Sequence, residues 1–307
     1  MKVIKSNLFS TYNNNSTVVA IGSFDGLHKG HQKIIKKTIK IAEKRNMKSG
    51  VFSFSPHPLE VIAPERSPSF LVSRRQKLNI LEELGIDYFF EQEFTEEFSK
   101  LTFEEFISNI MIDKIGVKHI IVGSDFKFGK NQSGNTEKLK KLSSKYNINT
   151  KIIPIIKKNT NKISSTNIRK LIKAGRVSEV KKYLGRNYKI EGTVVTGEGR
   201  GRKLGIPTAN LNLTTDYVLP PKGVYAAKVY TGDQEFKSVV NFGEKPTFSS
   251  GTYTIEAHIL DLEKNLYGDL LEVELYEFIR EEEKFSDEEE LISKIESDIL
   301  YTRNILC

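Results

Sequence analysis

Short apolar runs alternate with amphipathic segments along the first half of the chain. The apolar runs predict buried strands, at Thr17–Gly22, Val51–Phe54, Tyr88–Phe90, His119–Val122 and Lys151–Ile156. The segments between them repeat apolar residues every three or four positions and predict helices, at Lys29–Met47, Gln76–Leu84, Phe103–Ile115 and Thr136–Tyr146. One or two further helices are predicted over Ile168–Leu184. We therefore expect βαβ units and a parallel sheet covered on both faces, with ligands at the carboxyl ends of its strands.

After about residue 187 the pattern changes to short strand-like runs separated by Gly, Pro, Asn and Asp. These runs are Ile190–Val195, Gly223–Tyr230, Phe236–Phe242, Tyr253–Leu260 and Leu271–Phe278. Such runs without intervening helices predict an antiparallel barrel or sandwich. A last helix is expected over Asp287–Leu300, because its apolar residues share one face.

The composition is that of an ordinary globular protein. Hydrophobic residues make up 38% and charged residues 28% of the 307 positions, which excludes a chain that is disordered or collagen-like throughout. No stretch reaches the ~18 apolar residues of a membrane helix, and the first residues lack the apolar core of a secretory signal. The single cysteine, Cys307, excludes an intrachain disulfide. We expect a cytoplasmic protein without a membrane partner.

The charge is divided unevenly, which favours two domains. Residues 1–185 carry 33 Lys and Arg against 17 Asp and Glu, a net +16, whereas residues 186–307 carry 14 against 22, a net −8. We place the domain boundary between these two ranges. A basic half attracts polyanions such as nucleotides, pyrophosphate or nucleic acid, although many of its lysines also suit a solvated helix face.

A Gly-rich turn with two histidines follows the first predicted strand, at Gly22–His31. Small residues let backbone N–H groups approach a ligand closely, and the N-terminus of the next helix favours phosphate. His28 and His31 are three residues apart, so they share one face of the first helical turn. Two imidazoles there can stabilise charge on phosphate oxygens in a transition state, whereas a lone histidine is more often structural.

This H-x-G-H pattern is similar to the signature of the nucleotidyltransferase superfamily. The longer string resembles the FMN adenylyltransferase module of bacterial bifunctional riboflavin kinase/FAD synthetases. Three further strings fit the same family in order, at Phe52–Pro58, Val122–Gly129 and Lys162–Arg169. The resemblance implies a Rossmann-like nucleotidyltransferase domain over residues 1–185 that makes FAD and pyrophosphate from FMN and ATP.

The resemblance also implies roles for individual residues of this domain. His28 and His31 would be catalytic, and ATP and its phosphates would be bound by Gly22, Phe24, Asp25, Gly30, Asp125, Ser164, Ser165, Thr166 and Arg169. Ser165 or Thr166 can also simply cap the helix that begins there, and Asp125 also suits a turn. Pro56 and His57 would lie near the flavin, or form only a rigid loop. The loop Lys130–Asn135 departs from the family's basic Gly-Asp pattern, so no basic contact is assigned to it.

A second phosphate signature follows the first strand of the second half, at Gly197–Asn210. Four glycines and three cations suit a loop that wraps polyphosphate, and a flexible basic surface loop fits the composition equally well. The string lacks the Walker A spacing. It resembles the G-x-G-R-G-x-x-L-G-x-P-T-A-N signature of riboflavin kinases, which implies a kinase barrel over residues 186–307.

That resemblance assigns roles in the second domain. Thr208 and Asn210 would be ligands of Mg²⁺, which prefers oxygen donors. Glu256 would be the base, because riboflavin's 5′-hydroxyl must lose a proton to attack ATP. ATP would be bound by Gly197, Gly199, Arg200, Gly201, Arg202, Lys203, Gly205 and Pro207. Asn241 and Arg280 would lie near the flavin.

The sequence therefore predicts a bifunctional enzyme whose partners are the small molecules ATP, riboflavin and FMN, with Mg²⁺ as cofactor and FAD as product. Nucleic acid is not expected as a partner, because no nucleic-acid-binding module is recognisable. Two alternatives remain open. One is an enzyme with a single working site, and the other is a basic RNA-binding or flavin-sensing protein.

Overall fold

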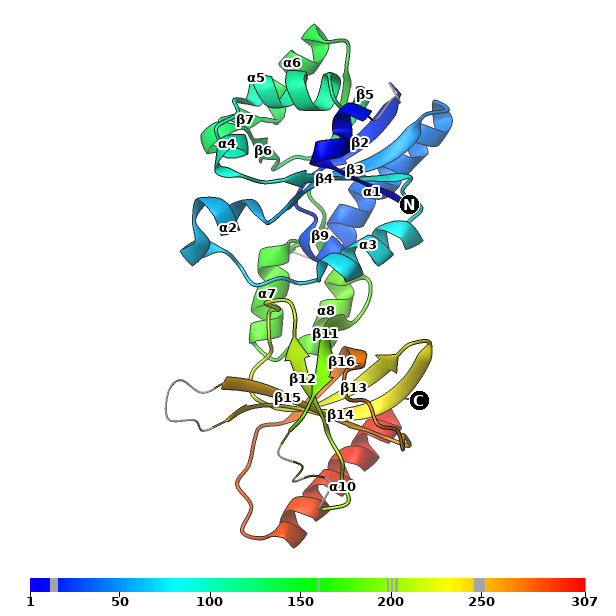
Figure 1. Cartoon of the computed structure of the whole chain (residues 1–307), viewed down its shortest axis with the longest axis vertical. Coiled ribbons are helices and arrows are strands. Elements are labelled where there is room, and N and C mark those ends of the chain that lie inside the picture. The colour runs from blue at the N-terminus through cyan, green and yellow to red at the C-terminus, as the bar shows by residue number, and fades with distance from the viewer. Residues whose placement is uncertain are drawn as a thin grey trace. The chain divides into compact units, whose positions relative to one another are not determined.

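The computed structural model describes residues 1–11, 16–158, 161–197, 199, 201, 204–245 and 252–306 (Figure 1). The chain divides into two compact units, Met1–Pro68 with Arg74–Ser164 and Ser69–Ser73 with Ser165–Cys307. The short segment Ser69–Ser73 joins the second unit because Phe70 exchanges backbone hydrogen bonds with Asp216 and Val218, at 2.7 and 2.9 Å. In the described residues, no helix is both long and apolar enough to cross a membrane.

The first unit is built on a parallel sheet of six strands in the order β1-β4-β3-β2-β5-β8. The strands are β1 (Lys2–Lys5), β2 (Thr17–Ile21), β3 (Lys48–Ser55), β4 (Tyr88–Glu93), β5 (Val117–Gly123) and β8 (Asn149–Ile153). The five predicted strands are all present. β1 was not predicted, because two apolar residues between lysines carry no periodic signal and only pairing with β4 extends them.

The connections of this unit hold its helices and several short elements. The longer helices are α1 (Lys29–Lys44), α3 (Arg74–Glu83) and α6 (Thr136–Lys145). The short elements are η1 (Ser6–Thr11), η2 (Asp25–Leu27), α2 (Pro58–Ile62), η3 (Pro64–Arg66), α4 (Glu96–Ser99), α5 (Phe103–Glu105), β6 (Lys127–Phe128), η5 (Lys130–Gln132), β7 (Gly134–Asn135), β9 (Lys157–Lys158) and β10 (Asn161–Lys162). The single helix predicted over Phe103–Ile115 is instead α5 followed by a π-helical segment, η4 (Phe106–Ile112).

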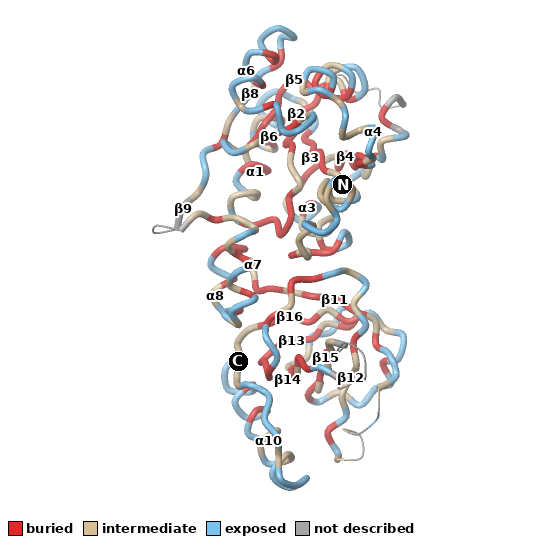
Figure 2. The backbone as a smooth tube through the Cα atoms, turned by 90° about the vertical axis from the view of Figure 1, so that its left-hand side faces the viewer, coloured by how far each residue is buried: buried red, intermediate tan, exposed pale blue. Residues whose placement is uncertain are grey.

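The sheet is buried on both faces, as Figure 2 shows along β2, β3 and β5. Val19 and Ile21 of β2 face one core with residues of η4 and α6, whereas Val18 and Ala20 face the other with residues of α1 and α3. This alternation follows from the two-residue period of a strand. A parallel sheet covered in this way is nearly continuously apolar, which is why its strands were visible in the sequence.

The strand order reverses between β2 and β5, which lie side by side in the centre of the sheet. In open α/β sheets ligands bind at such a reversal, beyond the carboxyl ends of the strands. The turn Gly22–His31 follows β2, and the segment Ser124–Phe126 follows β5. The topology therefore brings two of the sequence motifs to the same edge of the sheet.

The second unit begins with two helices, α7 (Ser165–Lys173) and α8 (Val177–Leu184), which resolves the choice between one and two that the pattern left open. A closed antiparallel barrel follows, in the order β11-β12-β15-β14-β13-β16. Its strands are β11 (Tyr188–Val195), β12 (Ala209–Leu213), β13 (Gly223–Thr231), β14 (Gln234–Lys245), β15 (Thr252–Ile259) and β16 (Leu270–Arg280). The barrel rather than the sandwich is thus the correct alternative, and β12, which was not predicted, closes it.

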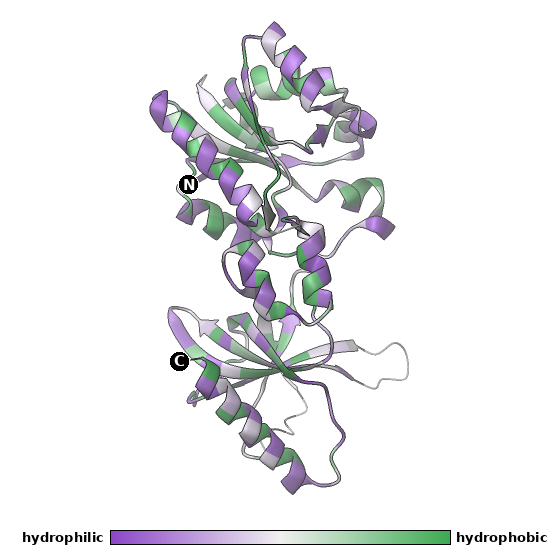
Figure 3. Cartoon of the chain, turned by 180° about the vertical axis from the view of Figure 1, so that it is seen from behind, coloured by the Kyte–Doolittle hydropathy of each residue, from purple (hydrophilic) through white to green (hydrophobic). Residues whose placement is uncertain are grey.

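The last helix, α10 (Glu288–Ile305), packs against β13 and β14. Hydrophobic and hydrophilic residues alternate along it in Figure 3. The predicted apolar positions Leu291 and Ile295 are only partly buried, and its two fully buried residues are Asp298 and Thr302. A polar contact, described below, therefore anchors this helix.

Candidate functional site

The turn after β2 reverses the chain sharply before α1. Phe24 has a left-handed backbone, with φ 49° and ψ 35°, although its side chain is buried. Gly26, at φ 76°, allows the next step of the turn without a steric penalty. Asp25 is 5% exposed. The turn is therefore a compact structure that presents the start of α1 in one orientation.

The two histidines of this turn are stacked. Their ring centroids lie 3.6 Å apart and the planes differ by 15°. His28 Nδ1 accepts a hydrogen bond of 3.2 Å from the backbone N–H of His31, so His28 caps α1. Because Nδ1 is an acceptor in this bond, Nε2 is the ring nitrogen of His28 that can donate to a ligand. A Cβ on Gly30 would lie 2.9 Å from the His28 ring, which explains a glycine between them.

His31 has the features of a ligand-binding group. Its Nδ1 is enclosed and has no hydrogen-bond partner among the described residues. Burial, then His28, then Lys77 hold the pKa of His31 well below its ordinary value, so the ring is neutral at neutral pH. A buried nitrogen without a partner costs free energy unless a ligand satisfies it.

Other predicted residues of the first unit lie close to this turn. Asp125 forms an ion pair of 2.7 Å with Lys162, the first residue of the Lys162–Arg169 string. The carbonyl of Ile163 would be 3.8 Å from a Cβ on Gly30. The structure thus brings together His28, His31, Gly30, Asp125 and the start of the Lys162–Arg169 string at one edge of the sheet.

From Ser165 onward the string belongs to the second unit. Its helix α7 begins at Ser165, which puts Ser164 at the position before the first turn, one residue earlier than the predicted cap at Ser165 or Thr166. Thr166 is exposed. Arg169 donates a hydrogen bond of 2.9 Å from Nε to the carbonyl of Ser69 within the same unit.

His57 has a structural contact of its own. Its Nδ1 accepts a hydrogen bond of 3.3 Å from Leu59, and its backbone N–H donates to Glu60 Oε1 at 2.5 Å. The two bonds form a capping box at the start of α2. Pro56 precedes this box. The rigid-loop alternative for His57 therefore has a specific physical basis.

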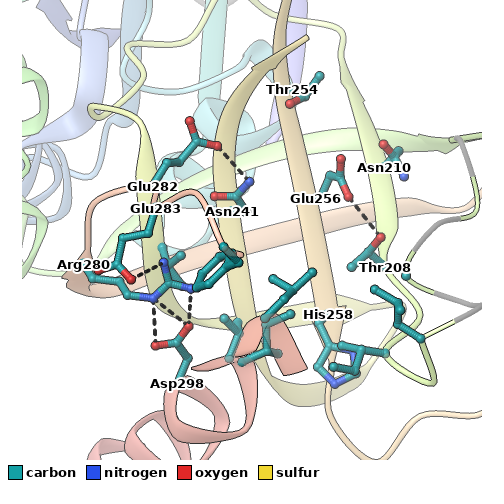
Figure 4. Close-up of a pocket in the computed structure, with 18 of the residues that line it drawn as sticks. Thr208, Asn210, Asn241, Thr254, Glu256, His258, Arg280, Glu282, Glu283 and Asp298 are labelled. Carbon is teal, nitrogen blue, oxygen red and sulfur yellow. Dashed lines mark hydrogen bonds and ion pairs between the residues drawn. The ribbon is translucent and has the colours of Figure 1, made fainter. Parts of the chain in front are cut away.

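The barrel holds a pocket of about 650 Å³ (Figure 4). Five of its lining residues form a single row of cross-strand partners, because Asn210 pairs with Glu256, Glu256 with Asn241, Asn241 with Val224, and Val224 with Arg280. Residues directly opposite on neighbouring strands share a face. Four strands thus deliver polar side chains from distant parts of the sequence into one pocket, and β13 adds the apolar Val224.

Glu256 lies between Asn241 and the pair Thr208 and Asn210 in Figure 4. The hydroxyl of Thr208 donates a hydrogen bond of 3.1 Å to Glu256 Oε2. His258, two residues further along β15, has its Nδ1 2.8 Å from the carbonyl of Pro207. Strand β15 therefore orients both the carboxylate and the segment that carries Thr208.

The Gly-rich loop reaches the same pocket through Gly199 and Gly201. A Cβ on Gly197 would lie 2.2 Å from Asn210 Nδ2, and one on Gly201 would lie 2.4 Å from the carbonyl of Ile206. These glycines permit a close approach that no other residue allows. Gly205 has a φ of 76° and precedes Pro207. Three further predicted residues, Arg200, Arg202 and Lys203, lie outside the described residues.

Arg280 is held by an ion pair with α10. Its guanidinium binds Asp298 through hydrogen bonds of 2.8 to 3.2 Å, and the two side chains are 13% and 4% exposed. The guanidinium carbon of Arg280 lies 5.6 Å from the centroid of the Phe285 ring. Asn241, the other predicted flavin residue, donates a hydrogen bond of 3.2 Å to Glu282. Arg280 therefore joins the barrel, the segment after β16 and the last helix.

Replacing Asp298 by alanine should destabilise the barrel unit strongly. Removing one partner of a buried ion pair leaves the other charge uncompensated, at a cost of about 3–5 kcal/mol. Urea denaturation followed by circular dichroism measures the loss. Lys264→Ala, which breaks an exposed pair with Asp269, is the matched control and should cost at most about 1 kcal/mol. Equal effects of the two variants would contradict the anchoring role of Asp298.

Several lining residues were not predicted as site residues. The polar ones include Thr254, His258, Glu244, Glu282, Glu283 and Asp298. Thr254 and His258 could have been found, because they flank Glu256 at the two-residue period of a strand. The acidic residues gave no signal that separates them from solvated charges, since their position depends on how the barrel closes.

Two family models match the chain, one in each half. Residues 10–167 match the model described as FAD synthetase, and residues 184–306 match the model described as riboflavin kinase. Together they span both the histidine turn and the barrel pocket.

Curated relatives match nearly the whole chain. Proteins described as bifunctional riboflavin kinase/FMN adenylyltransferase are 40% identical in Buchnera aphidicola of Schizaphis graminum, 36% in Listeria monocytogenes and 35% in Escherichia coli K12. The alignments cover 93% of this chain in each case, and 93%, 91% and 91% of the relatives.

A solved structure from Streptococcus pneumoniae, described as a macrolide-efflux protein, has the same fold. Its TM-score is 0.89 at 29% identity, and the match covers 99% of each chain. The word efflux belongs to that protein's description, and it fits neither the curated relatives nor the two family models.

Proposed function

Since the chain belongs to the family of bifunctional riboflavin kinases/FMN adenylyltransferases, we propose that its two activities are divided between a domain of residues 1–185 and a domain of residues 186–307. The second domain phosphorylates riboflavin to FMN with ATP. The first transfers an adenylyl group from ATP to FMN and releases pyrophosphate. The row of Asn210, Glu256 and Asn241 in the barrel pocket carries the assignment, because it supplies a carboxylate where a hydroxyl must be deprotonated.

In the barrel, Glu256 accepts the proton of the ribityl 5′-hydroxyl as that oxygen attacks the γ-phosphorus of ATP. The bond from this phosphorus to ADP breaks in the same step. The hydrogen bond from Thr208 keeps the Glu256 carboxylate oriented. The Gly-rich loop supplies close backbone contacts for the phosphates. Asn241 and Arg280 lie near the flavin.

The oxygen donors of the pocket fit Mg²⁺. In the described part of the chain no three His, Cys, Asp or Glu side chains are grouped as metal ligands. Mg²⁺ commonly needs only one or two protein oxygens when it also binds substrate phosphates. Thr208 and Asn210 would hold it, and the Thr208 hydroxyl can offer its oxygen while its hydrogen bonds Glu256. When bound, Mg²⁺ neutralises charge on the phosphates of ATP.

In the first domain the attacking group is the phosphate of FMN, which needs no base. An oxygen of that phosphate attacks the α-phosphorus of ATP, and the bond to pyrophosphate breaks. His28 and His31 donate hydrogen bonds to the phosphate oxygens as charge develops. Within the first unit, the nucleotide and pyrophosphate are bound by Gly22, Phe24, Asp25, Gly30, Asp125 and Ser164. We propose that the enzyme acts on these small molecules in the cytoplasm, without a nucleic-acid partner.

The test is chromatography of the products of two reactions. One starts from riboflavin, ATP and Mg²⁺, and the other from FMN, ATP and Mg²⁺. We expect FMN followed by FAD in the first and FAD in the second. FAD in the second reaction alone would show a dead kinase site, and FMN alone in the first would show a dead transferase site. No flavin product in either reaction would refute the proposed function.

A further inference from the structure

A half-buried lysine, Lys77, contacts the backbone of the histidine turn. Lys77 lies on α3, which packs against η2. Its Nζ donates a hydrogen bond of 3.0 Å to the backbone carbonyl of Ser23. The same carbonyl accepts a hydrogen bond of 3.1 Å from the hydroxyl of Ser53 on β3. The carbonyl of Ser23 is therefore held from two elements that are distant in sequence.

The carbonyl that Lys77 binds directly precedes a residue with an unfavourable backbone conformation. Phe24 follows Ser23 and has a positive φ of 49°. A non-glycine residue keeps such a backbone only where its surroundings hold it. The ring of Phe24 also meets the His31 ring edge to face, with centroids 5.3 Å apart. A shift at Ser23 would thus pass through Phe24 to His31.

Charged groups on neighbouring elements affect the pKa of Lys77, and Lys77 affects the pKa of His31. Asp25 on η2 and Glu91 on β4 favour the ammonium form, whereas burial and Arg74 on α3 lower the pKa of Lys77. Arg74 binds Glu91 through two hydrogen bonds, of 2.6 and 2.7 Å. Among the carboxylates near Lys77, Asp25 has the larger effect in favour of the ammonium form. The titratable groups that act on His31 are His28 and Lys77, and both favour its neutral form.

We propose that Lys77 is a positioning residue of the adenylyl-transfer site, which holds the Ser23–Asp25 turn and, through it, His31 in the geometry that transfer requires. This inference rests on the proposed function of the first domain. Lys77 affects His31 in two ways, through its hydrogen bond to the turn and through its positive charge. It does not need to touch ATP or FMN.

The experiment compares three variants of the full chain in FAD formation from FMN. Lys77→Met keeps a long side chain but removes the charge and the donor, and Lys77→Arg keeps both. Lys36→Met makes the same change at an exposed position of α1. We expect Lys77→Met to lower kcat about 100-fold, the usual cost of a displacement of about 1 Å. The KM for ATP and the riboflavin kinase rate should stay near those of the parent. Lys77→Arg should restore most of the rate, and Lys36→Met should lose none.

A second readout separates positioning from a general loss of structure. NMR titration of the His31 ring should show a higher pKa in Lys77→Met than in the parent, because a nearby positive charge has been removed. The pKa should be unchanged in Lys77→Arg and Lys36→Met. If Lys77→Met does not fold, Lys77→Gln serves the same comparison, with circular dichroism and thermal unfolding of the full chain as the measure of folding.

Two results would overturn the inference while the proposed function stands. One is a parent and a Lys77→Met variant that make FAD equally fast. The other is a slow Lys77→Met variant in which His31 titrates as in the parent. A parent that forms FMN but no FAD would refute the transferase assignment itself, and the inference with it.

Discussion

The Glu256→Gln variant should lose riboflavin phosphorylation and keep adenylylation of supplied FMN. Glutamine has nearly the shape of glutamate and can still accept the hydrogen bond from Thr208. It cannot take the proton of the ribityl hydroxyl. Loss of a general base costs about 10²–10⁴-fold in rate. Chromatography of products from riboflavin and from FMN, in parallel, measures both activities on one preparation.

The control for this variant is Glu263→Gln, which makes the same change at an exposed position after β15. It should leave both activities unchanged. If Glu256→Gln still forms FMN at the parental rate, Glu256 is not the base. If it loses both activities while it remains folded, the assignment of one activity to each domain is wrong.

The reverse pattern is expected when both His28 and His31 are replaced by alanine. FAD formation from FMN should disappear, and FMN formation from riboflavin should continue. Removing one donor to a developing oxyanion costs about 10²–10³-fold, and this variant removes two. The kinase rate of the same preparation shows that the chain is intact.

Part of that loss could arise because His28 caps α1. The variant His28→Asn separates the two roles, since asparagine is an effective helix cap but has no imidazole. We expect His28→Asn to fold with parental stability and to form FAD slowly. Parental rates of FAD formation in this variant would show that only the cap matters.

The elements that the sequence predicted well are those whose burial is regular. Strands such as β2 and β5 are apolar because both faces of the sheet are covered, and α1 shows the period of a half-buried helix. The strand β12 was not predicted because it begins in the last two residues of the Gly-rich signature, where a ligand motif and a strand overlap. The irregular helix over Phe103–Ile112 was predicted only as helical, because an apolar period does not distinguish an α from a π turn.

The site was predicted to the extent that its residues form local strings. The histidine turn and the strand around Glu256 each lie within a few consecutive positions. Lys77 and Asp298 carry no such signal, whereas His258 has only its two-residue spacing from Glu256. A lysine on a helix, a histidine on a strand and an aspartate in an acidic segment resemble solvated residues until their neighbours are known.

By itself the sequence determined the two fold types, the Gly-rich and histidine strings and the family, because these depend on short-range patterns of burial and turn chemistry. Only the tertiary structure decided which residues meet. The register of five barrel strands aligns Asn210, Glu256 and Arg280, and the packing of α3 brings Lys77 to the carbonyl of Ser23. Cross-strand register and helix packing join residues that are far apart in the chain, and local patterns do not contain that information.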